Sequence, residues 1–378
     1  MNKRLGYWLA CGVGVALQIG GGSAAIAACS KDVDGNFTCS GVSGTANVGA
    51  PISSSDGTTR HSAALVLASE LLEEEGEVIR ETGESAGPSG GSLGIFATGL
   101  YANKDLEESN DVPGSNSDTW GGVLGVDYSK NNYRVGMALD YTAEEADFDA
   151  AKGSQDTDEL GLQLFGTLRP QPNTFVALAF RYASLDIDNT RLTEASIQPL
   201  ARGETDGKRY GLSGGAGYTW PVRERTALDL SAWLAWQRNE IDGYTETGAV
   251  SSGSGDDSVD PNLQFSDDNY STLDGILELN LSHAFSSAGA DWFPSASLSY
   301  VHEFESDERQ VTATVDNSPL MGPLVFTTGA ADKNYVKLGA ALTGDFRQGT
   351  ALYASYQGTF LHDYREEHVI ALGVRQAF

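Results

Sequence analysis

The stretch Leu273-Asp-Gly-Ile-Leu-Glu-Leu-Asn-Leu281-Ser282 decides the fold class of this 378-residue chain. Its odd positions, from Leu273 to Leu281, are leucine or glycine, and its even positions include Asp274, Glu278 and Asn280. Side chains of a β-strand alternate between two faces, so this pattern predicts a strand with one apolar and one charged face. A soluble sandwich would turn the apolar face to a core and a membrane barrel would turn it to lipid, and alternation alone does not choose between them.

The same period-two pattern recurs from Leu93 to the end of the chain, as in Leu160–Leu168 and Leu228–Trp236. It predicts an all-β, antiparallel fold of twelve strands. We expect these strands at residues 93–102, 118–130, 132–142, 157–169, 173–185, 206–221, 225–240, 269–285, 290–304, 333–346, 350–361 and 366–378.

The connections between these strands alternate in length. Short turns fall at 130–132, 169–172, 221–224, 286–289 and 347–349, and long polar loops at 103–117, 143–156, 186–205, 241–268 and 305–332, with one short outer turn near 362–365. Short periplasmic turns and long external loops are typical of outer-membrane barrels. Aromatic residues near both strand ends, such as Tyr133, Phe293, Tyr141 and Tyr335, fit two belts at the lipid–water boundaries. We therefore predict a closed transmembrane β-barrel.

Residues 1–28 have the features of an export signal. Lys3 and Arg4 form a positive end, an apolar stretch follows, and Ala25-Ile26-Ala27 supplies a small-x-small cleavage site. A membrane anchor is the alternative, but the apolar stretch is short.

Residues 29–57 form a polar segment with two cysteines, Cys29 and Cys39. An even number of cysteines in an oxidising compartment favours a disulfide between them. Ile26-Ala27-Ala28-Cys29 also resembles a lipoprotein processing site, in which case Cys29 would carry lipid.

Residues 58–92 are predicted as a helix followed by a glycine-rich linker, because apolar residues recur at helical spacing from Ala64 to Ile79. A helix over 58–82 would span ~37 Å, comparable to the height of a barrel. The helix either occupies the pore or is an amphipathic linker outside it.

The charge balance is strongly acidic, with 24 Lys and Arg against 52 Asp and Glu and a net charge of −28. Nucleic acid is excluded as an expected partner, since binding it requires basic residues. The sign of the charge alone identifies no other partner.

The last strand carries the most specific signal. Ile370, Leu372, Gly373, Val374 and the terminal Phe378 resemble the C-terminal signal read by the barrel-assembly machinery. The position two before the terminus, where that signal has an apolar or aromatic residue, holds a glutamine.

Further segments resemble the β-domain of autotransporters, the type V secretion proteins. They are Gly121–Tyr128, Gly136–Tyr141, Asp147–Asp149, Ala201–Gly207, Ile241–Glu246, Glu303-Phe304 and His368–Gly373. The resemblance covers about residues 90–378 and implies a twelve-stranded barrel, residues 93–378 here, with the preceding segment threaded through the pore as a helix. It also implies a monomer in the outer membrane of a Gram-negative bacterium, with outer-membrane lipid, lipopolysaccharide and the barrel-assembly machinery as partners. Autotransporters usually carry a long passenger, whereas here about 60 residues separate the signal from the barrel.

The sequence contains few candidate catalytic or metal-binding residues. No cofactor or metal motif is present, and the five histidines include no His-Glu-x-x-His pair. His362, Asp363 and His368 could suggest an omptin-like protease site, but solvated loop residues are the simpler interpretation. Polar residues expected in the lumen are Arg134, Asp140, Glu159, Arg209, Asp229, Glu278, Lys337 and Arg375.

These features favour a non-enzymatic translocator that displays or exports a minimal N-terminal passenger. The alternatives are a helix-plugged channel or structural, porin-like barrel and, less favoured, a barrel enzyme.

Overall fold

A computed structural model of the chain describes eighteen stretches of residues. They are 15–17, 27–31, 37–41, 48–52, 91–107, 114–130, 132–149, 153–171, 173–193, 196–198, 200–223, 225–251, 262–304, 310–315, 323–327, 333–346, 349–362 and 365–378. Within them β-strands dominate, and no helix is long and apolar enough to cross a membrane.

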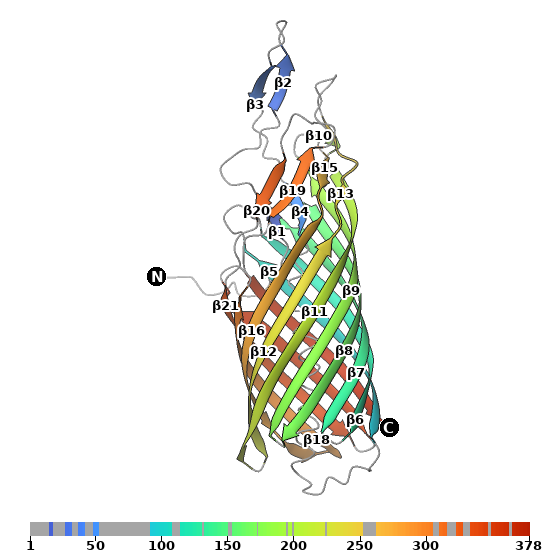
Figure 1. Ribbon diagram of the computed structural model, residues 1–378, viewed down its shortest axis with the longest axis vertical. Helices are drawn as coiled ribbons and strands as arrows, with labels where there is room; N and C mark the ends of the chain where they lie inside the picture. Colours follow the sequence, from blue (N-terminus) through green and yellow to red (C-terminus); the bar gives the residue numbers. More distant parts are fainter. Residues whose placement is uncertain are drawn as a thin grey trace, which may run out of the picture.

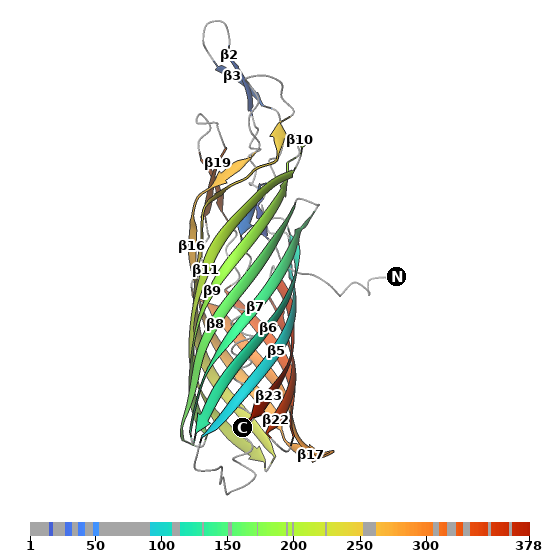
Figure 2. The same cartoon turned by 90° about the vertical axis from the view of Figure 1, so that its right-hand side faces the viewer.

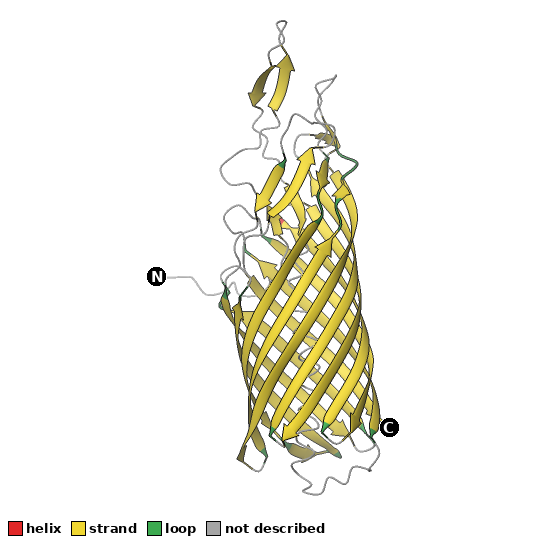
Figure 3. Ribbon diagram, viewed as in Figure 1, coloured by secondary structure: helices red, strands yellow, loops and turns green. Residues whose placement is uncertain are grey.

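Twelve long antiparallel strands form a closed ring (Figures 1 and 3), which confirms the predicted architecture. They are β5 (Ser92–Leu106), β6 (Ser115–Lys130), β7 (Tyr133–Phe148), β8 (Gly153–Gln171), β9 (Thr174–Leu192), β11 (Leu200–Arg223), β12 (Thr226–Ile241), β16 (Asp268–His283), β18 (Ala290–Glu303), β21 (Asn334–Phe346), β22 (Thr350–Phe360) and β23 (Arg365–Ala377). Neighbours in the ring are neighbours in the chain, and the last strand, β23, pairs with the first, β5, so no edge is left open. A short strand, β17 (Phe285–Ser287), pairs with β18 beside the turn at 288–289.

The two faces of β16 show whether the apolar side chains of the barrel point outward or into the lumen. Leu277, Leu279 and Leu281 point outward and are 51%, 40% and 49% exposed, whereas Asp274 and Asn280 point into the barrel and are buried. Exposed leucine, valine and aromatic side chains cover the outer wall of the other long strands in the same way. An apolar outer wall around a polar interior is the inverse of a soluble core, and it requires lipid as the surrounding solvent.

The strands run further than the sequence pattern predicted at the long-loop end. β7 continues to Phe148, β9 continues to Leu192, and β11 begins at Leu200, so much of the expected loops 143–156 and 186–205 is strand. In these extensions the outward positions carry carboxylates, whereas the inward positions mix apolar side chains, such as Ala146 and Ile187, with polar ones, such as Glu144 and Arg191. The outward face therefore loses its apolar residues beyond the membrane, which hid the strands from a search for apolar outer faces.

Two other expected loops contain strands as well. β13 (Tyr244–Thr245), β15 (Leu263–Phe265), β19 (Gln310–Val315) and β20 (Leu324–Thr327) form one four-stranded sheet, and β10 (Ser196–Gln198) pairs with β14 (Val250–Ser251). These small sheets lie at the end of the barrel opposite the C-terminus (Figures 1 and 2). We refer to them as the outer cap.

The N-terminal part contributes two short pairs of strands. β1 (Val15–Leu17) pairs with β4 (Val48–Ile52), and β2 (Ala27–Lys31) pairs with β3 (Phe37–Gly41) in a register that sets Cys29 opposite Cys39. The disulfide and the signal peptide stay predictions. The expected helix at 58–82 lies outside the described residues.

Candidate functional site: the barrel lumen

The inner wall of the barrel is lined by polar and charged side chains. Of the eight residues predicted to line the lumen, Arg134, Asp140, Glu159, Arg209, Lys337 and Arg375 are buried, and Asp229 and Glu278 are half-buried. Because the opposite face of each strand carries the exposed leucines, these side chains face the interior. They gather into separate networks along the barrel axis.

The first network lies near the short-turn end and joins the last strand to the second. Asp127 on β6 is buried and lies between two arginines. Arg375 of β23 donates from Nε and from Nη2 to the Asp127 carboxylate, at 3.1 and 2.9 Å. Arg134 of β7 donates to the same carboxylate at 3.1 Å. Since β5 lies between β23 and β6, this network spans the seam at which the barrel closes.

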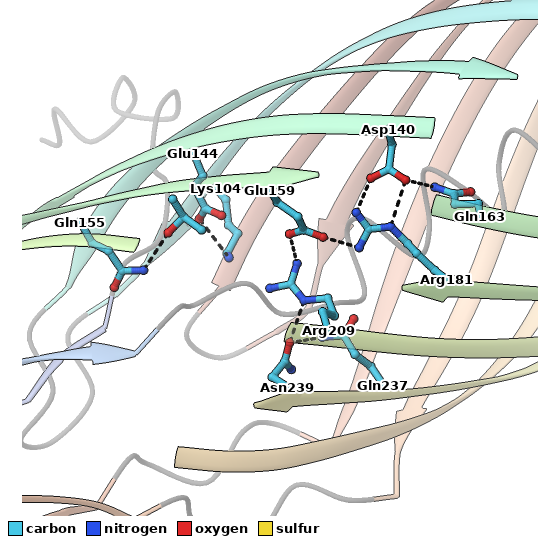
Figure 4. Close-up of polar contacts among 11 residues, drawn as sticks. Lys104, Asp140, Glu144, Gln155, Glu159, Gln163, Arg181, Arg209, Gln237 and Asn239 are labelled. Atoms are coloured by element: carbon cyan, nitrogen blue, oxygen red, sulfur yellow. Dashed lines mark hydrogen bonds and ion pairs between the residues drawn. The ribbon is translucent and has the colours of Figure 1, made fainter. Parts of the chain in front are cut away.

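The second network crosses five strands in the middle of the lumen (Figure 4). Arg181 of β9 pairs with both Asp140 and Glu159, and Arg209 of β11 pairs with the same Glu159. At its ends Gln163 donates to Asp140 at 3.0 Å, and Arg209 donates to Asn239 of β12 at 2.7 Å. Charge-assisted pairs of this kind satisfy polar groups that the interior removes from bulk water.

A third contact lies nearer the outer cap, where Lys104 of β5 is 3.9 Å from Glu144 of β7. Ser117 donates to the same Glu144 at 3.1 Å. At the outer rim Arg191 of β9 pairs with Glu246, which also accepts a hydrogen bond from the Leu263 amide at 2.9 Å. This last pair anchors the outer cap to the barrel wall.

The opposite wall, formed by β16, β18 and β21, is more acidic. Asp274 is buried, with Oδ1 accepting no hydrogen bond among the described residues, and Ser299 donates to Glu278 at 2.8 Å. Lys337 is the buried cation on this side. The lumen therefore has one wall on which arginines and carboxylates are paired and another on which carboxylates outnumber the cation.

Aromatic side chains on the inner wall, toward the short-turn end, lie over glycines of neighbouring strands. A Cβ added at Gly215 would lie 2.3 Å from the ring of Trp233, and one at Gly373 would lie 2.0 Å from the ring of Tyr353. Glycine is required at such positions because the ring occupies the space that any other side chain needs. The Gly211–Gly217 run thus belongs to a crowded strand.

The predicted assembly signal forms the outward face of β23. Ile370, Leu372, Val374 and the terminal Phe378 are exposed on the lipid side, and Gly373 lies on the inner side beneath Tyr353. The glutamine that interrupts the apolar pattern, Gln376, accepts a hydrogen bond from Thr350 at 2.5 Å. The backbone of Phe378 pairs with that of Leu93, which extends the closure of β23 on β5 to the last residue. Recognition of this strand by an assembly machinery stays a prediction.

The histidines are dispersed over the described part of the barrel. His283, His302 and His368 contact Thr226, Asn334 and Tyr356, and none of these contacts joins a histidine to a carboxylate. Asp363 and His61 lie outside the described residues. Over the same ranges no three histidine, cysteine or carboxylate side chains come close enough to hold a metal ion.

The comparison with protein families decides the assignment. The family model of the autotransporter β-domain matches residues 95–357, which is more than half of the chain. The chain belongs to the autotransporter β-domain family. Its barrel is a translocator domain of the Gram-negative outer membrane.

Solved structures show the same fold for this autotransporter β-domain. It is similar to the translocator domain of the autotransporter NalP from Neisseria meningitidis, with a TM-score of 0.58 at 16% identity, covering 82% of this chain and 97% of that one. It is also similar to the β-domain of the Bordetella autotransporter Brka, with a TM-score of 0.54 at 18% identity, covering 76% of this chain and 100% of that one.

One curated relative is similar in sequence. Outer membrane protein A of Rickettsia rickettsii is 26% identical over 203 residues, a match that covers 50% of this chain and 8% of that protein. The match thus spans a small part of the relative's length.

Sequence reasoning missed several lumen residues that the structure brings together. Asp127, Glu144 and Arg181 all lie on the inward face in phase with predicted lumen residues of the same or neighbouring strands. Counting every second residue from Asp140 would have found Glu144, whereas Asp127 on β6 and Arg181 on β9 lie on strands for which no lumen residue was predicted. The predicted aromatic belts were partly wrong, since Phe293 and Tyr335 are buried, whereas Tyr133 and Tyr141 are exposed on the outer wall as expected.

Proposed function

We propose that this autotransporter β-domain exports and displays the short N-terminal segment 29–57 on the cell surface. The main support is the position of the strands on either side of the connecting segment. β2 and β3 lie beyond the end of the barrel that carries the outer cap, and β5 begins at the opposite end (Figures 1 and 2). In this proposal the chain between β4 and β5 crosses the length of the barrel.

We propose that this connecting segment, residues 53–91, passes through the lumen and carries the plug helix expected at 58–82. The outer wall is apolar, and a chain with Glu70, Glu73, Glu74 and Glu77 would meet lipid there at high cost. The lumen instead is lined by polar and charged side chains, beside which such a chain meets no lipid.

In this proposal the protein is a monomer without catalytic function or bound cofactor. The barrel-assembly machinery inserts it into the outer membrane, where it contacts lipid and lipopolysaccharide.

Epitope insertion in intact cells tests the display. One epitope is inserted after Gly44, in the proposed passenger, and a matched one after Gly289, in a short turn at the other end of the barrel. We expect antibody to label the first variant on intact cells and the second only after permeabilisation. Labelling of the Gly44 variant only in permeabilised cells would overturn the proposal.

Planar-bilayer recording tests the plug. The full chain is compared with a variant lacking residues 58–82, and we expect conductance to rise on deletion because the polar lumen is then open. Equal, silent traces from both proteins would contradict a lumenal helix. A full chain that already conducts as strongly as the deletion variant would favour the channel alternative.

A further inference from the structure

The inner wall of the barrel carries a small apolar patch toward its outer end. Leu185 and Ile187 of β9 and Ile241 of β12 form one buried cluster, and Tyr270 of β16 packs against it. Leu185 and Ile187 lie on the inward face of β9, in phase with the buried Arg181 of the same strand. We call Leu185, Ile187 and Ile241 the mouth patch.

The mouth patch is continuous across three strands. Leu185 of β9 lies opposite Gly207 of β11, and Gly207 lies opposite Ile241 of β12. A Cβ added at Gly207 would lie 3.4 Å from Cδ1 of Leu185. The glycine therefore lets the leucine side chain lie against the intervening strand, which brings the apolar groups of β9 and β12 together.

Ion pairs border the mouth patch on two sides. Arg209 pairs with Glu159 toward the membrane, and Arg191 pairs with Glu246 toward the outer cap. An apolar surface between two charged networks, at a mouth open to water, is unfavourable unless an apolar group covers it. The three side chains of the patch are 2%, 0% and 4% exposed, so other parts of the chain shield them from water.

An apolar segment of the N-terminal part lies against this wall. β4 contacts β9, the strand that carries Leu185 and Ile187. In both views the blue β4 lies within the outline of the barrel, toward its outer end (Figures 1 and 2). Its sequence, Val48-Gly-Ala-Pro-Ile52, is the longest stretch of residues 29–57 without a polar side chain. The segment and the patch therefore match in polarity and in position.

We infer that the mouth patch binds residues 48–52 of this chain and so holds the base of the displayed segment in the outer mouth of the barrel. This inference rests on the proposed function, in which residues 53–91 pass through the lumen. On that path residue 52 is the last one outside the lumen, and the patch lies at the lumen's outer end. The binding covers apolar surface on both partners. It belongs to the mature chain, from which β1, the strand partner of β4, is removed with the predicted signal peptide.

Cysteine labelling of intact cells tests the binding. Gly44→Cys and Ala50→Cys are made separately in a chain in which Cys11, Cys29 and Cys39 are replaced by serine. A membrane-impermeant maleimide should label position 44 rapidly. It should label position 50 at least about tenfold more slowly, because a bound segment reacts only when it opens locally.

Two double substitutions on β9 separate the mouth patch from a general effect of the strand. Leu185→Asn/Ile187→Asn makes the patch polar, and the labelling rate at position 50 should rise to within about twofold of the rate at position 44. The matched variant Asp186→Asn/Asp188→Asn changes the outward face of the same strand and should leave position 50 protected. Heat-dependent gel mobility shows that each variant is folded.

A disulfide cross-link gives an answer that does not depend on the folding of the polar variant. Ala50→Cys is combined either with Ile187→Cys, in the patch, or with Ala177→Cys, on the same inward face of β9 nearer the short turns. Oxidation should join the first pair and leave the second apart. Cleavage of the denatured protein at a protease site inserted after Gly57 releases the N-terminal fragment unless the cross-link holds it.

The outcomes distinguish this inference from the proposed function. Absence of labelling at position 44 on intact cells would overturn the display itself. Rapid labelling at both positions would leave the display standing and overturn the binding of residues 48–52. Protection at position 50 that persists in the folded Leu185→Asn/Ile187→Asn variant, or equal cross-linking to both β9 positions, would overturn the mouth patch as the binding site.

Discussion

The lower half of the barrel, near the short turns, and the upper half, near the outer cap, differ in where their charged side chains lie. Near the short turns the charged groups point inward, and Asp127 is held by Arg134 and Arg375. Near the outer cap the outward face carries an acidic ladder of directly opposed carboxylates on neighbouring strands, namely Asp118, Glu145, Asp156, Asp158, Asp186, Asp188, Glu204 and Asp206. The same alternating strands run through both halves, so what changes is the solvent. Lipid outside the lower half forces charge into the lumen, whereas water and headgroups around the upper half allow charge on the wall.

The largest effect on stability should come from a substitution in the lower half, where the buried charges are paired. Asp127→Ala leaves two buried arginines without their shared carboxylate, and losing one partner of a buried pair costs about 3–5 kcal/mol. Urea unfolding in lipid vesicles measures the change. Asp186→Ala, which removes a carboxylate from the ladder, should leave stability unchanged or higher. Equal losses of stability in the two variants would contradict the proposed difference between the two halves.

A second comparison uses two adjacent residues of β16. Leu279→Arg sets a charge against lipid and should destabilise the folded barrel by about 2–4 kcal/mol if the position lies near the bilayer midplane. Asn280→Arg sets the same charge into the polar lumen and should cost distinctly less. Both are measured by the same vesicle unfolding assay, and a reversed order would mean that the faces are assigned the wrong way round.

Two glycine-to-alanine substitutions compare the packing of the inner wall with that of the outer wall. Gly215→Ala brings a Cβ to 2.3 Å from the ring of Trp233, so overpacking should cost about 1–3 kcal/mol. Gly99→Ala meets no atom within 4 Å and should be neutral or stabilising by about 0.4–1 kcal/mol through a less flexible unfolded chain. A neutral Gly215→Ala variant would show that Trp233 does not occupy this site.

The smallest expected effect is on pH dependence in the upper half. Asp105 lies beyond the aromatic belt, outside the membrane, and burial, with Asp149 and Glu366 nearby, raises its pKa to about 6. A carboxyl whose pKa is raised on folding binds its proton more tightly in the folded state. The barrel should therefore gain stability as pH falls through about 6 and lose it again as pH rises.

Unfolding midpoints at pH 7.5 and 5.5 in buffer without divalent cations measure this gain. Asp105→Asn should reduce the difference between the two pH values, and the Asp267→Asn control, in an exposed part of the outer cap, should not. A wild-type protein that is more stable at the higher pH would contradict the assignment.

The strand count and the closed topology could be predicted from the sequence because lipid imposes a strict alternation on residues such as Leu277 and Leu279. The outer ends of the strands could not, since beyond the membrane the outward positions hold Glu145 or Asp188 and the apolar signal disappears. The outer cap was missed for a related reason, because its strands are two to six residues long and pair across separate loops. The lumen residues could be predicted in part, because charged residues such as Arg209 and Asp140 are conspicuous within a strand. Which arginine pairs with which carboxylate depends on the register between strands, and the register comes only from the structure.

Accessibility along residues 273–282 tests most directly whether lipid surrounds the leucine face. Single spin labels are placed at each position of the refolded protein, and collision rates with oxygen and with a water-soluble nickel complex are measured. Labels at Leu277, Leu279 and Leu281 should collide with oxygen, and those at Asp274, Glu278 and Asn280 should show the smaller oxygen collision rate, in strict alternation. If the nickel complex reached the three leucine positions as readily as oxygen does, the leucine face would be in water and the transmembrane barrel would be wrong.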